Sequence, residues 1–155
     1  MKTVGVFEAK THFSTLRWNI KAASDDKSVE LSSLKIIAAF LNTEGGRLLI
    51  GVADDRQPLG LGGDHFASDD KMMLHLNSLI KDRIGILQAR FIKARVVELA
   101  GGVKILRIDC KRSVLPAFVK TDQGELFYVR TGPSTRALSA SEISPNIKTW
   151  FLRDP

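Results

Sequence analysis

The sequence predicts an α/β (α+β) single domain with a mixed sheet, hairpins and about three to four helices. Residues 30–42 and 68–84 repeat apolar side chains at the spacing of an amphipathic helix. After residue 90, short β-like runs follow one another across turn residues, which is typical of antiparallel hairpins. The chain has 155 residues, of which 44% are hydrophobic and 26% are charged, and this composition is ordinary for one domain with its own core.

An N-terminal strand and a short helix are expected before the first long helix. Residues 3–7 have the composition of a strand, and residues 8–16 place apolar side chains on one side of a short helix. The polar residues 24–28 predict a loop. The long helix then begins at Glu30 and ends near Asn42.

Two adjacent glycines are expected to end this helix. Gly45 and Gly46 tolerate positive φ, so they can form a left-handed stop, and their expected role is this structural turn. A buried strand over residues 47–52 follows at once and leaves Asp54 and Asp55 near its carboxyl end. The glycine-rich loop that comes next lacks the residues of a P-loop.

The second half of the chain is expected to contain a second helix and then a hairpin. Ser68 is a suitable N-cap for this helix, and Gly85 ends it. Strands over residues 90–99 and 103–110 are separated by the turn residues 100–102, which is the pattern of a hairpin.

Two shorter strands and a last helix complete the predicted fold. The strands span residues 116–120 and 126–130, with a turn between them. Ser134 and Thr135 are expected in a polar loop. Because proline suits the first turn of a helix, Ser144 followed by Pro145 predicts the start of the last helix.

Composition narrows the classes of function. The formal net charge of +6 is compatible with a nucleic-acid partner, DNA or RNA. The single cysteine, Cys110, excludes an internal disulfide, and the histidines have no zinc-ligand spacing. No apolar run approaches the roughly 20 residues that cross a bilayer, so we expect a cytoplasmic protein without a membrane partner.

Basic side chains on the predicted strands are the candidates for nucleic-acid binding. Lys93 and Arg95 project to one face of their strand, and Arg107 is expected near them across the hairpin. Such cations can follow a phosphate backbone. Arg130, beside glycine and hydroxyl residues at a strand end, is suited to bidentate phosphate contacts, and Arg136 would extend that patch. The alternative for these cations is a solvated outer face.

Asp54 and Asp55 are candidates for a different kind of site. Carboxylates that cluster can hold a divalent metal ion for phosphodiester cleavage, although one acidic pair alone seldom suffices. The alternative is a turn, since aspartate side chains bond nearby backbone amides.

Four strings of the sequence resemble the Schlafen AlbA-type domain family. They are LKIIAAFLNTEGGRLLIGVADDRQPLGL, DKMMLHLNSLIKDRIG, LRIDCKRSVLPAF and ELFYVRTGPSTRAL. The resemblance implies a Schlafen AlbA-like mixed-sheet fold over residues 14–152, preceded by an extension over residues 1–13. It also implies a function associated with nucleic acids, because bacterial members are mostly described as DNA-binding domains.

The same resemblance implies an alternative, a metal-dependent endoribonuclease acting on structured RNA. Some animal Schlafen proteins cleave RNA with three carboxylates, and Asp54 or Asp55 matches the third of them. The first two would fall near His12 and Arg17, which are not acidic, so the site is incomplete. Mg²⁺ or Mn²⁺ would be the cofactor of such an enzyme, and otherwise no cofactor is expected.

The first residues, MKTVGVFEAKTHFS, resemble the opening of Phd/YefM-type antitoxins, which are dimeric DNA-binding proteins. The match covers only the start of such a domain and implies at most a possible homodimer. Three functions therefore stay open: a domain that binds DNA or RNA through backbone phosphates, a metal-dependent endoribonuclease, and a protein-interaction or dimerisation module.

Overall fold

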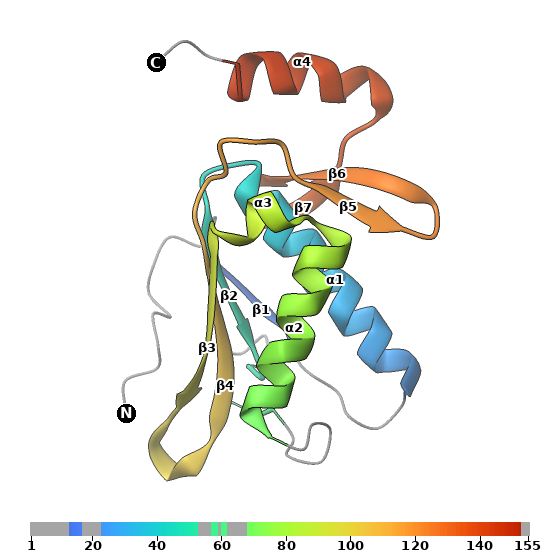
Figure 1. Cartoon of the computed structure of the whole chain (residues 1–155). Helices are drawn as coiled ribbons and strands as arrows, with labels where there is room; N and C mark the ends of the chain where they lie inside the picture. The colour runs from blue at the N-terminus through green and yellow to red at the C-terminus, as the bar shows by residue number, and fades with distance from the viewer. Residues whose placement is uncertain (1–12, 17–22, 53–56, 59, 62–67, 153–155) are drawn as a thin grey trace.

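The computed structural model describes the chain except for residues 1–12, 17–22, 53–56, 59, 62–67 and 153–155 (Figure 1). The described elements, in chain order, are β1 (Phe13–Leu16), α1 (Ala23–Leu41), β2 (Gly46–Ile50), α2 (Asp69–Arg83), α3 (Ile86–Ala89), β3 (Ile92–Glu98), the 3₁₀ turn η2 (Ala100–Gly102), β4 (Lys104–Cys110), β5 (Phe118–Thr121), β6 (Gly124–Thr131), β7 (Ser134–Ala137) and α4 (Ala140–Trp150).

The strands form two small sheets, and the predicted α+β class is confirmed. The first sheet has the order β1-β2-β4-β3, in which β1 runs parallel to β2 and the other pairs are antiparallel. The second sheet is antiparallel and has the order β5-β6-β7. Helices α1 and α2 lie side by side along the first sheet, and the second sheet lies across the end of α1 (Figure 1). The predicted strands are thus divided between two sheets.

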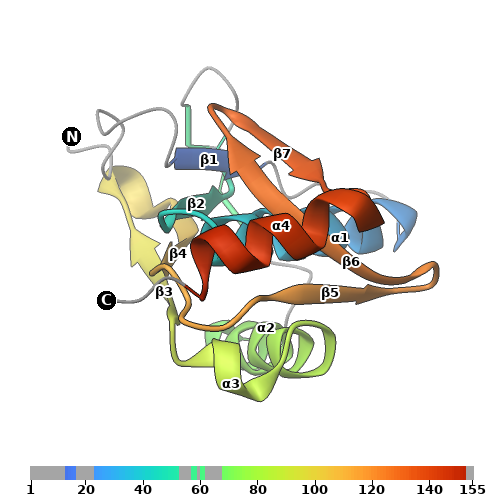
Figure 2. The same ribbon diagram turned by 90° about the horizontal axis from the view of Figure 1, so that it is seen from above.

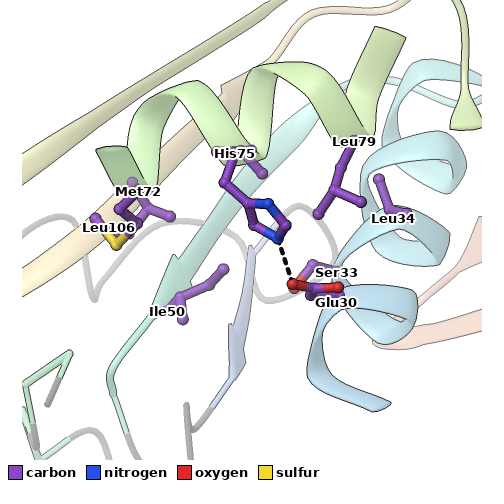
Figure 3. Close-up of a pocket in the computed structure, with 9 residues that line it drawn as sticks. Glu30, Ser33, Leu34, Ile50, Met72, His75, Leu79 and Leu106 are labelled. Atoms are coloured by element: carbon purple, nitrogen blue, oxygen red, sulfur yellow. Dashed lines mark hydrogen bonds and ion pairs between the residues drawn. The ribbon is translucent and has the colours of Figure 1, made fainter. Parts of the chain in front are cut away.

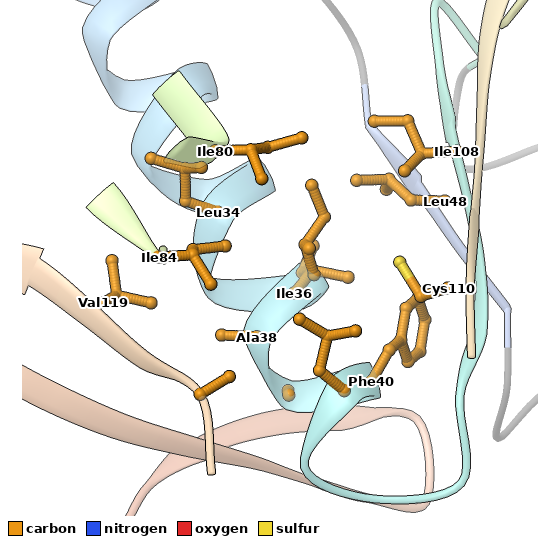
Figure 4. Close-up of a cluster of buried hydrophobic side chains, with 14 of the residues drawn as sticks. Leu34, Ile36, Ala38, Phe40, Leu48, Ile80, Ile84, Ile108, Cys110 and Val119 are labelled. Atoms are coloured by element: carbon orange, nitrogen blue, oxygen red, sulfur yellow. The ribbon is translucent and has the colours of Figure 1, made fainter. Parts of the chain in front are cut away.

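The core lies between the first sheet and helices α1 and α2. Leu48 and Ile108 of the sheet pack in one cluster with Leu34 of α1 and Ile80 of α2 (Figure 4). Val119 extends the cluster to the second sheet. Because both sheets contact α1, residues 36–41 of this helix are buried on every side. The sequence pattern predicted only one buried face.

Helix α1 is longer than the sequence predicted. It ends at Leu41, close to the expected position, but it begins at Ala23, so the predicted loop over residues 24–28 is wrong. This stretch contains two adjacent aspartates, and acidic residues suit the first turn of a helix because the amino end of the helix dipole is positive. Polarity alone therefore gave the wrong assignment.

The corner after α1 depends on Gly45. Its φ is +80°, and its N–H donates to the carbonyl of Phe40 at 2.8 Å, which closes the helix end. A Cβ atom at this position would lie 2.6 Å from the carbonyl oxygen of Cys110. Gly46 is the first residue of β2 and pairs with Cys110. The left-handed stop is therefore made at Gly45, with Gly46 already in the strand.

Polar side chains at the end of α1 hold the second sheet. Asn42 is buried, and its Nδ2 donates to the carbonyls of Ala117 at 2.8 Å and Tyr128 at 2.9 Å. Its Oδ1 accepts a bond from the N–H of Ala117 at 2.8 Å. The hydroxyl of Thr43 donates to Ala39 and accepts from the N–H of Arg130. These bonds fix strands β5 and β6 against the helix.

Several local predictions agree with the structure. Ser68 caps α2 and accepts a bond from the N–H of Lys71 at 3.2 Å, and the helix ends before Gly85. Strands β3 and β4 form the predicted antiparallel hairpin across residues 100–102. Strands β5 and β6 form the second hairpin.

Two predictions near the strand edges are wrong. Phe13–Leu16 is strand β1, so the helix predicted over residues 8–16 does not include these four residues. The rest of that helix, and the strand predicted over residues 3–7, lie outside the described residues. Ser134–Ala137 is strand β7 rather than a polar loop. Both strands are short edge strands, whose formation depends on pairing with a neighbour rather than on an apolar pattern.

The last helix also begins earlier than predicted. Ser139 is the N-cap of α4, and a capping box joins it to Glu142, so Pro145 lies inside the helix rather than at its start. The helix lies over the second sheet (Figure 2). None of its eleven residues, all of them described, is fully buried. Arg112 holds its end, with the guanidinium 4.0 Å from the centre of the Trp150 ring.

In the described part of the chain, no helix is both long and apolar enough to cross a membrane.

Candidate nucleic-acid interface

The outer face of the first sheet, opposite α1 and α2, carries the predicted strand cations. Side chains alternate between the two faces of a strand, and Leu106 and Ile108 of β4 point into the core. Arg107 and Asp109 therefore project outward, together with Lys93 and Arg95 of β3. The sequence placed these three cations on one face, and the register of the sheet does the same.

The strand register arranges this face in rows. In one row Arg47, Asp109 and Lys93 lie side by side on β2, β4 and β3. In the next row Leu49, Arg107 and Arg95 do so. Lys93 and Arg95 are exposed. We call Arg47, Lys93, Arg95, Arg107 and Asp109 the basic face.

Asp109 links two arginines of the basic face. Its Oδ1 accepts from Nε of Arg47 at 2.8 Å, and its Oδ2 accepts from Nε of Arg107 at 2.9 Å. Among the described residues of these two rows, Asp109 is the acidic one, and the rows hold four cations. One carboxylate thus orients two guanidinium groups and leaves the face with excess positive charge.

Arg95 and Arg107 stand directly opposite each other on neighbouring strands. Like charges in this position destabilise a sheet, and a bound anion relieves the repulsion. Leu49 of this row, with Ile105 and Val97 of the next outward-facing row, belongs to a second apolar cluster, in which Leu49 and Ile105 are buried. The basic face therefore borders a buried apolar cluster on the same side of the sheet.

Arg130 lies in the second sheet, away from the basic face. Its Nη1 donates to the hydroxyl of Thr135 at 2.8 Å, and its guanidinium carbon lies 5.3 Å from the centre of the Phe40 ring. Burial lowers the pKa of this guanidinium. These contacts attach β6 and β7 to the end of α1.

Arg136 lies on the opposite face of the second sheet from Arg130. Arg130 pairs in register with Thr135, whereas Arg136 pairs with Val129, and adjacent positions of a strand point to opposite faces. Nη2 of Arg136 makes an ion pair with Glu142 of α4 at 3.1 Å. The backbone N–H of Ser139, followed by the Arg136 guanidinium, lowers the pKa of Glu142 to about 2. Arg130 and Arg136 thus do not form one continuous patch.

The fold and sequence place the protein in a known family. Residues 15–139 match the family described as Schlafen, AlbA_2. The chain belongs to this family. Among solved structures it is similar to the DIP2311 protein from Corynebacterium diphtheriae, with 16% identity and a TM-score of 0.63. The alignment covers 90% of this chain and 27% of that one, so the chain spans about a quarter of the length of the solved relative.

The family match of this Schlafen AlbA_2 chain ends at residue 139, immediately before α4. The asparagine and threonine of its NTEGG string are Asn42 and Thr43, which bind the second sheet. The first glycine of the string, Gly45, makes the close approach to β4. The string is therefore a structural signature of the joint between the helix and the two sheets.

The acidic pair of the Schlafen AlbA_2 chain, Asp54 and Asp55, lies outside the described residues. Its metal-binding and catalytic roles therefore stay predictions. Among the residues that the structure describes, no three His, Cys, Asp or Glu side chains gather closely enough to hold a metal ion.

Two other sets of chemically functional side chains belong to the domain, the thiol of Cys110 and the pair of His75 with Glu30. Burial raises the pKa of the Cys110 thiol, which keeps it protonated and unreactive. A small apolar pocket between α1 and α2 has His75 and Glu30 at its edge, with Nε2 of His75 2.5 Å from Oε1 of Glu30 (Figure 3). Its volume of about 10 Å³ has room for about one water molecule and not for a larger ligand.

Arg47 and Asp109 belong to the basic face of this Schlafen AlbA_2 domain but were not among the predicted residues. Alternation along GRLLIGV separates Arg47 and Leu49 from the core residues, so the outward direction of Arg47 was available from the sequence. The residues beside Arg47 in the sheet were not available from the sequence, because the pairing of β2 with β4 places Arg47 next to Asp109, 62 positions away.

Proposed function

We propose that the basic face of the first sheet binds nucleic acid, DNA or RNA, through backbone phosphates. The observation that carries the proposal is the juxtaposition of Arg95 with Arg107, flanked by Lys93 and Arg47, on the outer side of a sheet. Lys93 and Arg95 are exposed there, and the side chains of Arg47 and Arg107 are each 18% exposed. Cations that stand next to one another on neighbouring strands can contact phosphate oxygens of a nucleic-acid backbone without contacting base edges. Membership of the Schlafen AlbA_2 family supports a role connected with nucleic acids.

Asp109 gives the basic face two properties that a simple cluster of cations lacks. It holds Arg47 and Arg107 by Nε, which orients the two guanidinium planes before any ligand arrives. It also repels phosphate, so binding should be moderate and strongly dependent on salt. Contacts limited to the backbone supply little sequence preference.

The test compares two variants that each lose three positive charges. The first is K93Q/R95Q/R107Q on the basic face, and the control is K71Q/K81Q/K148Q, whose lysines are exposed on α2 and α4. Fluorescence anisotropy with a labelled 20-base-pair DNA, a single strand and an RNA hairpin gives the dissociation constants at 50 and 200 mM salt.

We expect the first variant to lose about 30-fold or more in affinity for the preferred ligand, because three phosphate contacts are removed. The control variant should lose far less. Equal losses of affinity in the two variants would show that binding depends on the net charge of the protein and not on the basic face. Negligible binding of the unmodified protein at 50 mM salt would overturn the proposal.

A further inference from the structure

The structure exposes a group of large aliphatic side chains beside α3. Ile86 and Leu87 of this helix are 71% and 59% exposed, and Val114 and Leu115 of the β4–β5 connection are 63% and 38% exposed. We call these four residues the α3 patch. Soluble proteins bury most side chains of this kind, and a cluster that stays exposed marks an interaction site.

The two halves of the α3 patch are held together by hydrogen bonds. Nε2 of Gln88 donates to the carbonyl of Pro116 at 3.1 Å, and the N–H of Lys111 donates to the carbonyl of Phe91 at 2.9 Å. Figures 1 and 2 show α3 next to the connection between β4 and β5. The patch is thus a fixed surface formed by two segments distant in sequence.

Positive charge surrounds this apolar surface. Residues 83–92 and 110–120, which contain the α3 patch, hold five lysine or arginine residues and no acidic residue. Arg90, Lys111 and Arg112 are exposed. The guanidinium of Arg90 lies 5.0 Å from the centre of the Phe91 ring, so its charge stays next to the patch. A ligand that covers the aliphatic side chains also meets these cations.

We propose that the α3 patch docks an acidic, amphipathic segment of a partner protein. The aliphatic side chains of that segment would cover Ile86, Leu87 and Val114, and its carboxylates would face Arg90 and Lys111. Charge complementarity favours this occupant over a second copy of the chain, because two copies would bring identical basic rims together. A four-residue helix also presents too little apolar surface for firm membrane insertion.

This surface is separate from the basic face. Ile86 and Leu87 lie on a helix that contacts α2, on the side of the sheet opposite to Arg95 and Arg107. The two surfaces can therefore be occupied at the same time. The proposal for one surface can be wrong while the proposal for the other holds.

The experiment selects peptides from a phage library of random 16-residue sequences against the full chain. A second selection removes those that bind the variant I86S/L87S. We expect the enriched peptides to carry net negative charge and several leucine, isoleucine or phenylalanine residues. The affinity of a synthetic copy of one enriched peptide is then measured for each variant.

The control variant is Leu74→Ser, because Leu74 is 66% exposed on α2 and is not part of the α3 patch. The affinity for the peptide should fall by about tenfold or more in I86S/L87S and by about fivefold in R90Q/K111Q. In Leu74→Ser it should fall by less than about twofold. Thermal unfolding of the four proteins should coincide, since the substituted side chains are exposed.

Four results would overturn the proposal. They are enrichment of neutral or basic peptides, no enrichment, an equal loss with Leu74→Ser, and unchanged affinity in R90Q/K111Q. Two further measurements detect the other occupants. A dimer seen by sedimentation equilibrium that I86S/L87S abolishes would assign the patch to a second copy. Binding to vesicles of anionic phospholipid that the same variant abolishes would assign it to a membrane surface.

Discussion

On the first sheet, Lys93 and Arg95 are exposed and lie beside Arg107, which pairs with Asp109 and is 18% exposed. On the second sheet Arg130 and Arg136 contact the rest of the fold, although the side chain of Arg136 is 52% exposed. Arg130 contacts Thr135 and the Phe40 ring, and Arg136 is paired with Glu142. Basic residues that all lie on strands thus have different surroundings. A basic residue on a strand therefore indicates a binding surface only when its row in the sheet is known.

The difference follows from how each sheet is held. The first sheet packs on α1 and α2 through a large apolar cluster, and its outer face carries charged side chains beside a smaller buried cluster that includes Leu49 and Ile105. The second sheet has only three strands and lies across the end of α1. Its attachment relies in addition on hydrogen bonds from Asn42, Thr43 and Arg130. Polar groups that build the joint are not available to a ligand.

The largest expected effect is on the joint between α1 and the second sheet. Asn42→Ala removes three buried hydrogen bonds and leaves groups of Ala117 and Tyr128 without partners, which should cost about 3 kcal/mol of stability. Urea unfolding followed by circular dichroism measures the free energy of unfolding. Asn77→Ala, at an exposed position of α2, is the control and should change it by less than about 0.5 kcal/mol. A similar small change in Asn42→Ala would show that the joint depends on apolar contacts alone.

The next effect separates a structural arginine from a binding arginine. Arg130→Met keeps much of the side-chain volume but loses the bond to Thr135 and the contact with the Phe40 ring, so stability should fall by about 1–2 kcal/mol. Affinity for nucleic acid, measured on the folded protein, should stay within about twofold. If affinity falls while stability is unchanged, Arg130 belongs to the interface, as the sequence predicted. The distinction between binding cations on the first sheet and structural cations on the second would then be wrong.

A smaller effect is expected from the carboxylate of the basic face. Asp109→Asn removes a charge that repels phosphate, so affinity at low salt should rise by about threefold, which corresponds to about 0.7 kcal/mol. The gain should shrink at high salt, because screening weakens the repulsion that is removed. Anisotropy titrations at 50 and 200 mM salt measure the affinities of Asp109→Asn and of the unmodified protein. A loss of affinity would instead show that Asp109 acts mainly by orienting Arg47 and Arg107.

The smallest effect concerns pH and the attachment of α4. The pKa of Glu142 is lowered to about 2 by the N–H of Ser139 and by Arg136, whereas its usual value is 4.5. Because the folded-state value is the lower one, the carboxylate stabilises the helix start fully above about pH 4.5. This contribution is lost as the pH falls toward 2.

NMR titration of the Ser139 amide should report this transition. Its chemical shift is expected to change with a midpoint near pH 2, and Glu142→Gln should abolish the change while leaving the amides of strand β3 unaffected. A midpoint near 4.5 would show that the capping box and the Arg136 pair do not form in solution.

The parts of the fold that the sequence predicted are governed by local interactions. Ser68 caps α2 through a residue three positions away, and the β3–β4 hairpin closes across three turn residues. The start of α4 is also encoded locally, since Ser139 and Glu142 have the spacing of a capping box, although Ser144 followed by Pro145 predicts a later start. Strands β1 and β7 were not predictable in this way, because an edge strand is defined by its partner.

For the candidate interface, the local residue pattern is enough to show which residues are basic and on which side of their own strand they lie. The period of two along β3 is a property of the backbone, so Lys93 and Arg95 share a face in any sheet. The folded domain adds that Arg107 stands opposite Arg95, that Asp109 links Arg47 to Arg107, and that Arg130 contacts Phe40. Register and the packing of one sheet on a helix are set by contacts between residues far apart in the chain, which no local pattern encodes.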